Sequence, residues 1–354
     1  MIAKNGDDIQ GLLAREKIHG LLLNSEANVS WCVDFHAPDS MLLVARDKQF
    51  LFTDFRYAAD YRRKIRKDVE VIETENGLFQ TIISCLDRLK LKTIGFESRH
   101  LTFAECQTFH SLSKRRIQWI PLALTLEPLR EVKREAEIRK IKKGIAVTQK
   151  ALGFAKRILK AGKTELEIAS ELERFIRLNG AQKSAFDMIV ASGPNSSYPH
   201  ASVTGRRLRN GEPVLIDLGV DFEGYKCDLT RTFFLGKINP IVLRIDTIVR
   251  LAQQKAIQGI RQGVLINKID ACARNYISEN GFGKNFGHAL GHGLGLEVHE
   301  APSINKHNKN RLKKDSVFTI EPGIYIPGKY GVRREDIVRV TEAGVEVLSG
   351  GNRH

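Results

Sequence analysis

The residues with the clearest chemical potential are carboxylates set into apolar, strand-like sequence. Asp217 interrupts the apolar run Val214–Gly219, and Asp228 follows beyond a turn-forming segment, Asp221–Gly224. A buried carboxylate without a partner is costly. A symmetric hairpin about that turn would pair Asp217 with Asp228, with their Cβ atoms about 4.5–5.5 Å apart. A cation between the two carboxylates would turn their repulsion into binding, whereas a register slipped by one residue would leave one aspartate to cap the turn.

The same construction returns later in the sequence. The extended run Glu321–Ile326 is followed by a loop rich in glycine and proline and by a second extended run, Val332–Val338. A hairpin centred on Gly328 would pair Glu321 with Glu335. A charged surface strand could explain one such hairpin, but two hairpins with matched carboxylates favour a cation site.

A glycine-spaced stretch between the hairpins, residues 287–300, holds His288, His292 and His299. Glycine permits close backbone approach and sharp turns. A lone histidine in an apolar stretch is usually a core residue, but three of them in twelve residues favour a site. His200 ends the loop 193–200 and, taken alone, is typical of a surface histidine.

These residue types favour one class of metal. Four carboxylates and at least one imidazole suit a hard, oxygen-preferring ion such as Mn²⁺ better than zinc on thiolates. Shared carboxylates also suit two ions about 3.5–4 Å apart, which together generate a hydroxide nucleophile and polarise a carbonyl group.

The composition limits the class of protein. The chain has 354 residues, 42% hydrophobic and 27% charged, which excludes disorder, collagen-like repeats and coiled coil for the whole chain. Its formal charge of +15 suggests either nucleic-acid or acidic partners, or a solvated basic surface. The basic residues are scattered through amphipathic helices, so we favour the basic surface and expect no nucleic-acid partner.

The sequence gives little indication of a targeting segment, a membrane span or a disulfide framework. No stretch approaches the roughly 20 apolar residues needed to span a bilayer, and charges throughout the first thirty residues leave no room for a signal-peptide core. The five cysteines are odd in number and form no CxxC pair, which argues against a disulfide framework. We expect a cytoplasmic protein with no membrane partner.

The elements that must position these residues fall into two domains, as the length predicts. Residues 1–122 alternate short strands with helices, which predicts a small α/β domain, and residues 123–132 read as a linker. Residues 133–354 begin with a long amphipathic helix near 133–160 and continue as α+β sequence. Later helices are predicted near 165–179, 242–262 and 268–279.

Three segments resemble the metal-site segments of the pita-bread metallopeptidases: Asp217–Thr232, His288–Pro302 and Glu321–Asp336. Within that superfamily the chain is similar to the aminopeptidase P and prolidase branch, which hydrolyses the bond between an N-terminal residue and a following proline. Asn28–Trp31 and Phe50–Tyr57 resemble the N-terminal domain of that branch, which methionine aminopeptidases generally lack. The resemblance implies an α/β N-terminal domain followed by an α+β pita-bread catalytic domain of the creatinase/aminopeptidase type.

The resemblance also implies two divalent metal ions held by five residues. Asp217 would chelate the first ion, and His292 and Glu321 would bind the second. Asp228 and Glu335 would bridge both ions. Mn²⁺ is the expected metal, with Co²⁺, Zn²⁺ or Fe²⁺ as alternatives, and a hydroxide bridging the ions would attack the Xaa-Pro carbonyl.

Catalytic and supporting roles follow from the same resemblance. His299 would contact the substrate carbonyl or stabilise the oxyanion, and His200 would lie near the substrate. Glu321 would also shuttle the proton between hydroxide and amine. Three residues would line the site or support its ligands and substrate: His288, Tyr325 and Arg333.

The expected partners are peptides with proline at the second position, and we expect a homodimer. The sequence leaves open whether the enzyme is an aminopeptidase acting on longer peptides or an Xaa-Pro dipeptidase. A metal-free, creatinase-like C–N hydrolase is disfavoured because that branch does not keep the five ligands. The remaining alternative is a catalytically inactive pita-bread protein that binds a protein partner or nucleic acid. The charge mildly favours that alternative, and the intact ligand set disfavours it.

Four residues depart from the family pattern. Arg334 stands where an apolar strand residue is expected, and Val203 replaces a commoner proline after His200. Gly144 and Gly153 interrupt the long helix, at a cost of roughly 1 kcal/mol each. None of these departures removes a predicted ligand.

Overall fold

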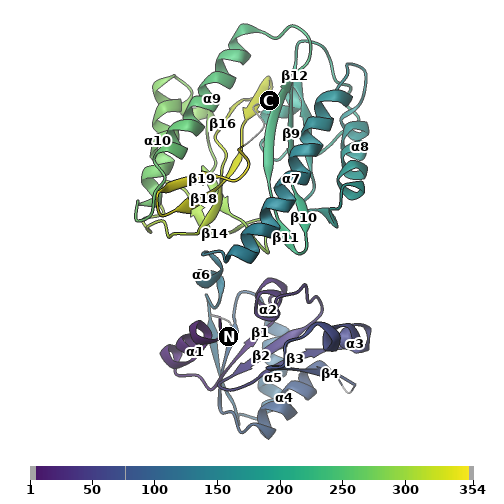
Figure 1. Cartoon of the computed structure of the whole chain (residues 1–354), viewed down its shortest axis with the longest axis vertical. Helices are drawn as coiled ribbons and strands as arrows, with labels where there is room; N and C mark the ends of the chain where they lie inside the picture. Colours follow the sequence, from purple (N-terminus) through teal and green to yellow (C-terminus); the bar gives the residue numbers. More distant parts are fainter. Residues whose placement is uncertain (1–4, 76, 351–354) are drawn as a thin grey trace. The chain divides into compact units, whose positions relative to one another are not determined.

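A computed structural model describes residues 5–75 and 77–350 of the chain. Contacts divide the chain into two units, Met1–Arg130 and Glu131–His354 (Figure 1). The first unit is α/β and the second is α+β, so the predicted fold class is confirmed. No helix of the described part is long and apolar enough to cross a membrane.

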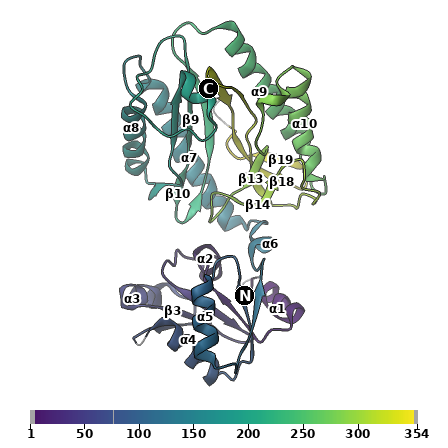
Figure 2. The same ribbon diagram turned by 180° about the vertical axis from the view of Figure 1, so that it is seen from behind.

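The first unit is built on one mixed sheet of six strands in the order β4-β3-β2-β1-β5-β6. Antiparallel pairing joins β1 to β2 and β2 to β3, and the other neighbours are parallel. Helix α5 lies across one face of this sheet (Figure 2). The strands are β1 Gly20–Leu23, β2 Met41–Ala45, β3 Gln49–Thr53, β4 Val69–Glu73, β5 Thr93–Glu97 and β6 Gln118–Leu122, and the helices are α1 Asn5–Glu16, α2 Glu26–Val33, α3 Phe55–Lys64, α4 Leu78–Arg88, α5 Phe103–Ser113 and α6 Glu127–Arg130.

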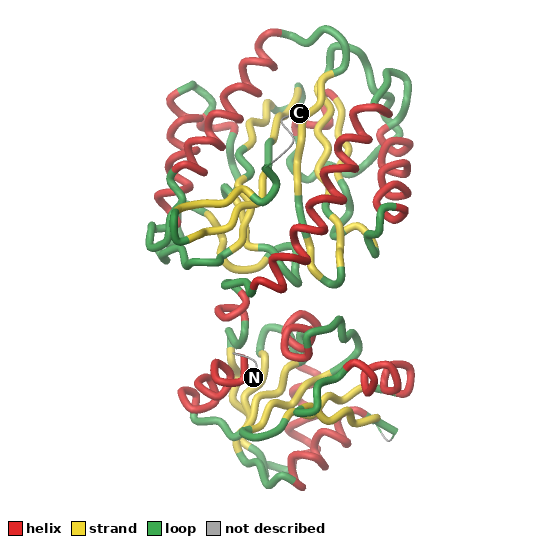
Figure 3. Tube along the Cα trace, in the orientation of Figure 1, coloured by secondary structure: helices red, strands yellow, loops and turns green. Residues whose placement is uncertain are grey.

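The described part of the second unit contains two large hydrophobic cores, each formed by a pair of helices packed on antiparallel strands. The first core joins α7 and α8 to β8–β12, and the second joins α9 and α10 to β15–β18. Figure 3 shows the helices of this unit flanking the central strands on both sides. The helices are α7 Glu135–Ile158, α8 Glu165–Leu178, α9 Pro240–Gln258 and α10 Ile266–Glu279, with short 3₁₀ turns η1 Gly193–Ser197 and η2 Gly283–Asn285.

The strands of this unit form small antiparallel sheets. Those of the first half are β7 Lys183–Ser184, β8 Ile189–Ser192, β9 Pro213–Leu218, β10 Val220–Phe222, β11 Tyr225–Lys226 and β12 Leu229–Phe234. Those of the second half are β13 Gly291–Gly293, β14 Glu300–Ile304, β15 Val317–Ile320, β16 Gly323–Ile326, β17 Tyr330–Arg333, β18 Asp336–Thr341 and β19 Gly344–Val347. The central sheets are β12-β9-β8 and β14-β13-β15-β18-β19.

Local sequence explains how α7 packs. A Cβ atom at Gly144 would lie 3.3 Å from Cys227 Sγ, so this glycine allows α7 to approach the strands closely. A Cβ at Gly153 would meet nothing within 4 Å, so packing does not require that glycine. Thr164 caps α8 with a capping box to Glu167, as its sequence predicts.

Candidate metal and active site

All five predicted metal ligands line one cavity of about 880 Å³ in the second unit. His200, His288, His299 and Arg333 line the same cavity. Tyr325 reaches it through a contact between its hydroxyl and His288 Nε2, 3.1 Å apart. The structure therefore brings every predicted site residue together, from β9, β13, β16, β17 and the segments beside them.

The predicted register of the first hairpin is wrong. Asp217 pairs with Thr230, not with Asp228. The turn is tighter than expected, because Glu223 and Gly224 both have positive φ, 51° and 85°, and form a two-residue connection between β10 and β11. The partner of Asp217 shifts by two residues, so Asp228 stays on the same face of the hairpin as a diagonal neighbour.

The predicted register of the second hairpin is confirmed for the paired residues of β16 and β17, where Gly323 lies opposite Arg333. The same register continues in β15 and β18, where Ile320 lies opposite Asp336. Glu321 and Glu335 fall in the short break between these two ladders. Their backbone N–H groups bond elsewhere, to the carbonyls of Leu290 and Thr230. The break leaves both carboxylates free to face the cavity.

Three carboxylate oxygens at the centre of the site are buried and lack a hydrogen-bond partner among the described residues: Asp217 Oδ1, Asp228 Oδ1 and Glu335 Oε1. Ligand atoms of Asp228, His292 and Glu335 all lie within 4.8 Å of one another. His292 Nε2 lies 3.7 Å from Asp228 Oδ2 and 3.5 Å from Glu321 Oε1. Buried, unpaired carboxylate oxygens around one point fit a divalent cation.

The electrostatics agree with that geometry. Burial, followed by the charges of neighbouring carboxylates, raises the pKa of Glu335 to about 8 and the pKa values of Asp228 and Glu321 well above their ordinary range. The protein alone therefore disfavours the charged form of these groups, and cations between them would favour it. The residues fit metal ions in both number and chemical type.

His292 is oriented as a metal ligand should be. Its Nδ1 lies 3.1 Å from the Gly293 carbonyl oxygen, so a proton on Nδ1 leaves the Nε2 lone pair facing Asp228 and Glu321. Burial lowers the pKa of His292 to about 4, which keeps the imidazole neutral near pH 7. A neutral imidazole is the form that binds metals.

Arg333 connects the ligands to the wall of the cavity. Its Nη2 donates to Asp217 Oδ2 at 2.6 Å, and its Nη1 donates to Tyr325 OH at 2.9 Å and to the Pro199 carbonyl at 3.0 Å. Its Nε donates to Thr230 Oγ1 at 3.0 Å. Only 3% of Arg333 is exposed, so this guanidinium is a fixed part of the site.

The other three histidines lie around the carboxylates. The ring centroids of His292 and His299 are 4.2 Å apart, and burial with a smaller contribution from His200 lowers the pKa of His299. Burial lowers the pKa of His288 to about 4. His200 is exposed at the edge of the cavity. The neutral imidazoles of His288 and His299 have N–H groups to offer an oxygen atom of a substrate.

Sequence reasoning missed Thr230. Its hydroxyl donates to Glu335 Oε2 at 2.8 Å and accepts from Arg333 Nε, so it links a ligand to the guanidinium. Thr230 lies two residues after Asp228 in an extended segment, and the period of two along a strand could have placed it on the same face.

Glu165 was also missed, because it looks like an ordinary acidic residue in the first turn of α8. It is fully buried, and its carboxylate accepts hydrogen bonds from Ser192, Asn195 and Thr204, including two backbone N–H groups. These residues flank the loop that carries His200. No signal in the sequence distinguishes Glu165 from its exposed neighbours.

A second cluster of potential ligands in the first unit is Glu97, His100 and Glu127. Glu97 already accepts hydrogen bonds from the backbone of Asn24 and Ser25 and from the side chains of Asn28 and Thr125. Because the oxygens of Glu97 already accept hydrogen bonds from the protein, we interpret this cluster as part of the structure of the first unit and not as a metal site.

Comparison with known proteins adds independent evidence. The model of Metallopeptidase family M24 matches residues 139–342, and that of the Creatinase/Prolidase N-terminal domain matches residues 7–132. An uncharacterised peptidase of Bacillus subtilis is 33% identical over 343 residues, covering 97% of each chain. A Xaa-Pro dipeptidase of Pyrococcus horikoshii is 41% identical over 228 residues, covering 64% of this chain and 65% of the relative.

Solved structures match along nearly the whole chain. A Xaa-Pro dipeptidase from Bacillus anthracis superposes with a TM-score of 0.95 at 31% identity, covering 99% of this chain and 98% of that one. An X-Pro aminopeptidase from Thermotoga maritima superposes with a TM-score of 0.91 at 34% identity, covering 99% of both chains. The fold and the carboxylate-lined cavity thus define a metallopeptidase. The chain belongs to metallopeptidase family M24, in the aminopeptidase P/prolidase branch.

Proposed function

We propose that the protein is a dimetal Xaa-Pro peptidase that hydrolyses the bond between an N-terminal residue and a following proline. The observation that carries the proposal is a set of three buried carboxylate oxygens without a partner among the described residues, on Asp217, Asp228 and Glu335, in one cavity with His292 and Glu321. An inactive binding protein would have no need to hold four carboxylates together against their repulsion. We therefore do not favour the alternative of an interaction or nucleic-acid-binding protein.

Two divalent ions, with Mn²⁺ as the proposed metal, would bind these five residues. Asp217 would hold one ion, His292 and Glu321 the other, and Asp228 and Glu335 both. When bound, such ions supply Lewis acidity and lower the pKa of water to near neutrality. Arg333 and Thr230 would fix the carboxylates of Asp217 and Glu335 in position, because each bonds one oxygen and leaves the other unpartnered.

The histidines around the ligands are proposed to act on the substrate. His299, next to His292, would donate a hydrogen bond to the scissile carbonyl oxygen as negative charge develops there. His200 would contact the substrate from the edge of the cavity, and His288 with Tyr325 would line the wall. Glu321 would carry the proton to the proline nitrogen, which is a poor leaving group until it is protonated.

Recognition of proline would rest on shape. An Xaa-Pro bond has no N–H, so a peptidase cannot read it through that donor. It also populates the cis form at about 10–30% in unfolded peptides, and a site that reads the ring by shape would accept one isomer, which we propose to be trans. The segment from His288 to His299, with Ala289 and Val298 lining the cavity, offers a wall for the pyrrolidine ring.

Substrate length and assembly belong to the same proposal. The structural neighbours bear the names of both dipeptidases and aminopeptidases, and we favour cleavage of tripeptides and longer peptides. We propose a homodimer, which sedimentation velocity would test. A cytoplasmic location is in keeping with the five free cysteines, none of which forms a disulfide.

Product analysis tests the proposal. Metal-stripped protein reloaded with Mn²⁺, Co²⁺, Zn²⁺ or Fe²⁺ would be given Ala-Pro, Ala-Pro-Ala and the matched Ala-Ala peptides. We expect release of alanine from the proline peptides only. Equal cleavage of Ala-Ala-Ala and Ala-Pro-Ala would contradict proline specificity and indicate a general dimetal aminopeptidase. Absence of cleavage with every ion would contradict the proposal that the protein is a peptidase.

A further inference from the structure

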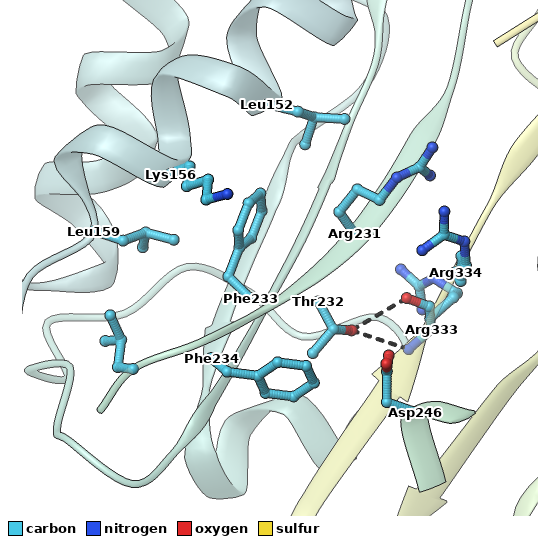
Figure 4. Close-up of a pocket in the computed structure, with 11 residues that line it drawn as sticks. Leu152, Lys156, Leu159, Arg231, Thr232, Phe233, Phe234, Asp246, Arg333 and Arg334 are labelled. Carbon is cyan, nitrogen blue, oxygen red and sulfur yellow. Dashed lines mark hydrogen bonds between the residues drawn. The ribbon is translucent and has the colours of Figure 1, made fainter. Parts of the chain in front are cut away.

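A second cavity of about 320 Å³, which we call the rear cavity, lies between α7, β12 and α9. Figure 4 shows Leu152, Lys156 and Leu159 on one side of it and Arg231, Arg334 and Asp246 on the other. Its size falls within the range of small-molecule sites, roughly 300–1,000 Å³. Of the residues assigned to the proposed metal and substrate sites, only Arg333 also lines this cavity in the described part of the chain.

The rear cavity and the catalytic cavity share a wall. Successive side chains of an extended segment point to opposite faces. Glu335 lines the catalytic cavity, Arg334 lines the rear cavity, and Arg333 lies in the shared wall and lines both. Arg231 is also on the rear side, whereas Thr230 contacts Arg333 and Glu335. Arg334, which departs from the family pattern, therefore belongs to the rear cavity.

Two carboxylates, Asp336 and Asp246, act on Arg334, but neither accepts a hydrogen bond from its guanidinium among the described residues. Its side chain is one-quarter exposed, and its ion pair with Asp336, from Nε to Oδ2, is 4.0 Å long. Asp336 already receives Arg231 Nη2 at 2.7 Å and the Ser349 hydroxyl at 2.8 Å. In the described part of the chain, no side-chain hydrogen bond satisfies the Arg334 guanidinium.

The charge around the rear cavity is positive. Lys156 is exposed at the cavity and forms no ion pair within the described residues. Asp246 is the one acidic residue of the lining, and burial raises its pKa against the opposing charges of Arg334 and Arg250. The lining holds four cations and one carboxylate, Asp246. Arg231 and Arg333 are paired with Asp336 and Asp217, which leaves Arg334 and Lys156 to attract an added anion.

The remaining walls are apolar. Leu152, Leu159, Phe233, Phe234 and Leu235 line the cavity, and the last three are only partly buried. A ligand with an apolar body would cover these partly exposed side chains. We infer that the rear cavity binds an apolar molecule carrying one carboxylate group, with the Arg334 guanidinium as the partner of that carboxylate. Arginine suits this task because its planar fork matches a carboxylate in a bidentate manner.

Calorimetric titration of the metal-loaded full-length chain with octanoate tests the inference, with octanamide as the uncharged match. We expect saturable binding of one octanoate per chain. Arg334→Leu and the change to octanamide should each weaken binding at least about tenfold, the effect of losing one charge-assisted hydrogen bond. Arg62→Leu, which removes one positive charge from the first unit, is the matched control and should bind as the wild type does.

Two further measurements keep the outcome clear. Lys156→Glu changes an exposed residue, so it is expected to fold, and it should weaken octanoate binding as well. The titration repeated after metal removal should give the same affinity. Absence of saturable binding, or binding that survives Arg334→Leu and disappears with the metal, would overturn the inference. The second result would place the carboxylate in the catalytic cavity.

Discussion

Arg333 donates a 2.6 Å hydrogen bond from Nη2 to Asp217 Oδ2, while the other oxygen of that carboxylate, Oδ1, is buried without a partner among the described residues. The guanidinium thus fixes one oxygen and leaves the second to face the cavity. Because Arg333 also bonds Tyr325 and the carbonyl of Pro199, it ties a proposed metal ligand to the loop that carries His200.

Arg333→Lys is therefore expected to weaken metal binding or activity about 10–100-fold, the usual effect of losing a group that orients a ligand. A lysine ammonium cannot reproduce the four-partner fork. Metal titration by calorimetry with kinetics on a proline peptide measures both effects. The matched control is Arg339→Lys, which changes a residue of β18 that forms an ion pair with Asp315. Unchanged metal affinity and turnover in Arg333→Lys would show that the fork is dispensable.

His299→Ala is expected to retain both ions and to lose about 10²–10³-fold in turnover, the scale of losing one donor to an oxyanion. Elemental analysis and steady-state kinetics on the same preparation separate the two properties. The control is His307→Ala, an exposed histidine outside the lining of the catalytic cavity. Loss of metal in His299→Ala would make His299 a ligand instead.

Glu165→Gln is expected to destabilise the protein by roughly 1.5–3 kcal/mol, because hydrogen bonds to a buried carboxylate are lost. Turnover should fall as well, since the loop that positions His200 would loosen, while the metal content stays unchanged. Urea unfolding and kinetics check both results. Glu167→Gln, two residues along α8, removes an exposed capping carboxylate and should leave turnover unchanged. Equal effects of the two variants would contradict the role given to Glu165.

The two hairpins show what the sequence could and could not specify. The second register followed from a loop centred on Gly328, and pairing of Gly323 with Arg333 bears it out. The first register was wrong because Glu223 adopts positive φ beside Gly224 and makes the turn two residues tighter. A glutamate does not predict a two-residue turn with positive φ, since asparagine, aspartate and glycine are the residues that favour such turns.

The wrong turn length affected the predicted strand register, but it did not affect which residues were predicted to form the site. An even shift keeps Asp228 on the same face as Asp217, so the residues gather in spite of the wrong pairing. Thr230 and Glu165 escaped notice for a different reason. The period of two along the strand could have placed Thr230 on the face of Asp228, but it does not predict the contact with Glu335. The contact of Glu165 with Thr204, far along the chain, has no signal in the local sequence.

The metal-free protein should lose stability as the pH rises from about 6.5 to about 8. Burial and neighbouring carboxylates raise the pKa of Glu335 from 4.5 to about 8, and the pKa values of Asp228 and Glu321 shift in the same direction. In this window the folded protein binds protons that the unfolded chain has released, so deprotonation opposes folding. Below about pH 6.5 the buried histidines, whose pKa values are lowered, act in the opposite sense.

Urea unfolding in EDTA and with Mn²⁺ measures this dependence. The unfolding free energy in EDTA should fall across the window, and the fall should shrink in Glu335→Gln. With Mn²⁺ the fall should disappear, because the ions favour the charged carboxylates. A metal-free protein whose stability rises from pH 6.5 to pH 8 would contradict the electrostatic account.

The most direct test of the central claim is metal content set against activity for the wild type and Asp228→Asn. Asp228 is proposed to bridge both ions, so its amide should leave them poorly held and reduce turnover on a proline peptide by orders of magnitude. The account predicts about two ions per chain in the active wild type and a loss of metal and turnover together in the variant. Full activity with one ion per chain, or in Asp228→Asn, would contradict it.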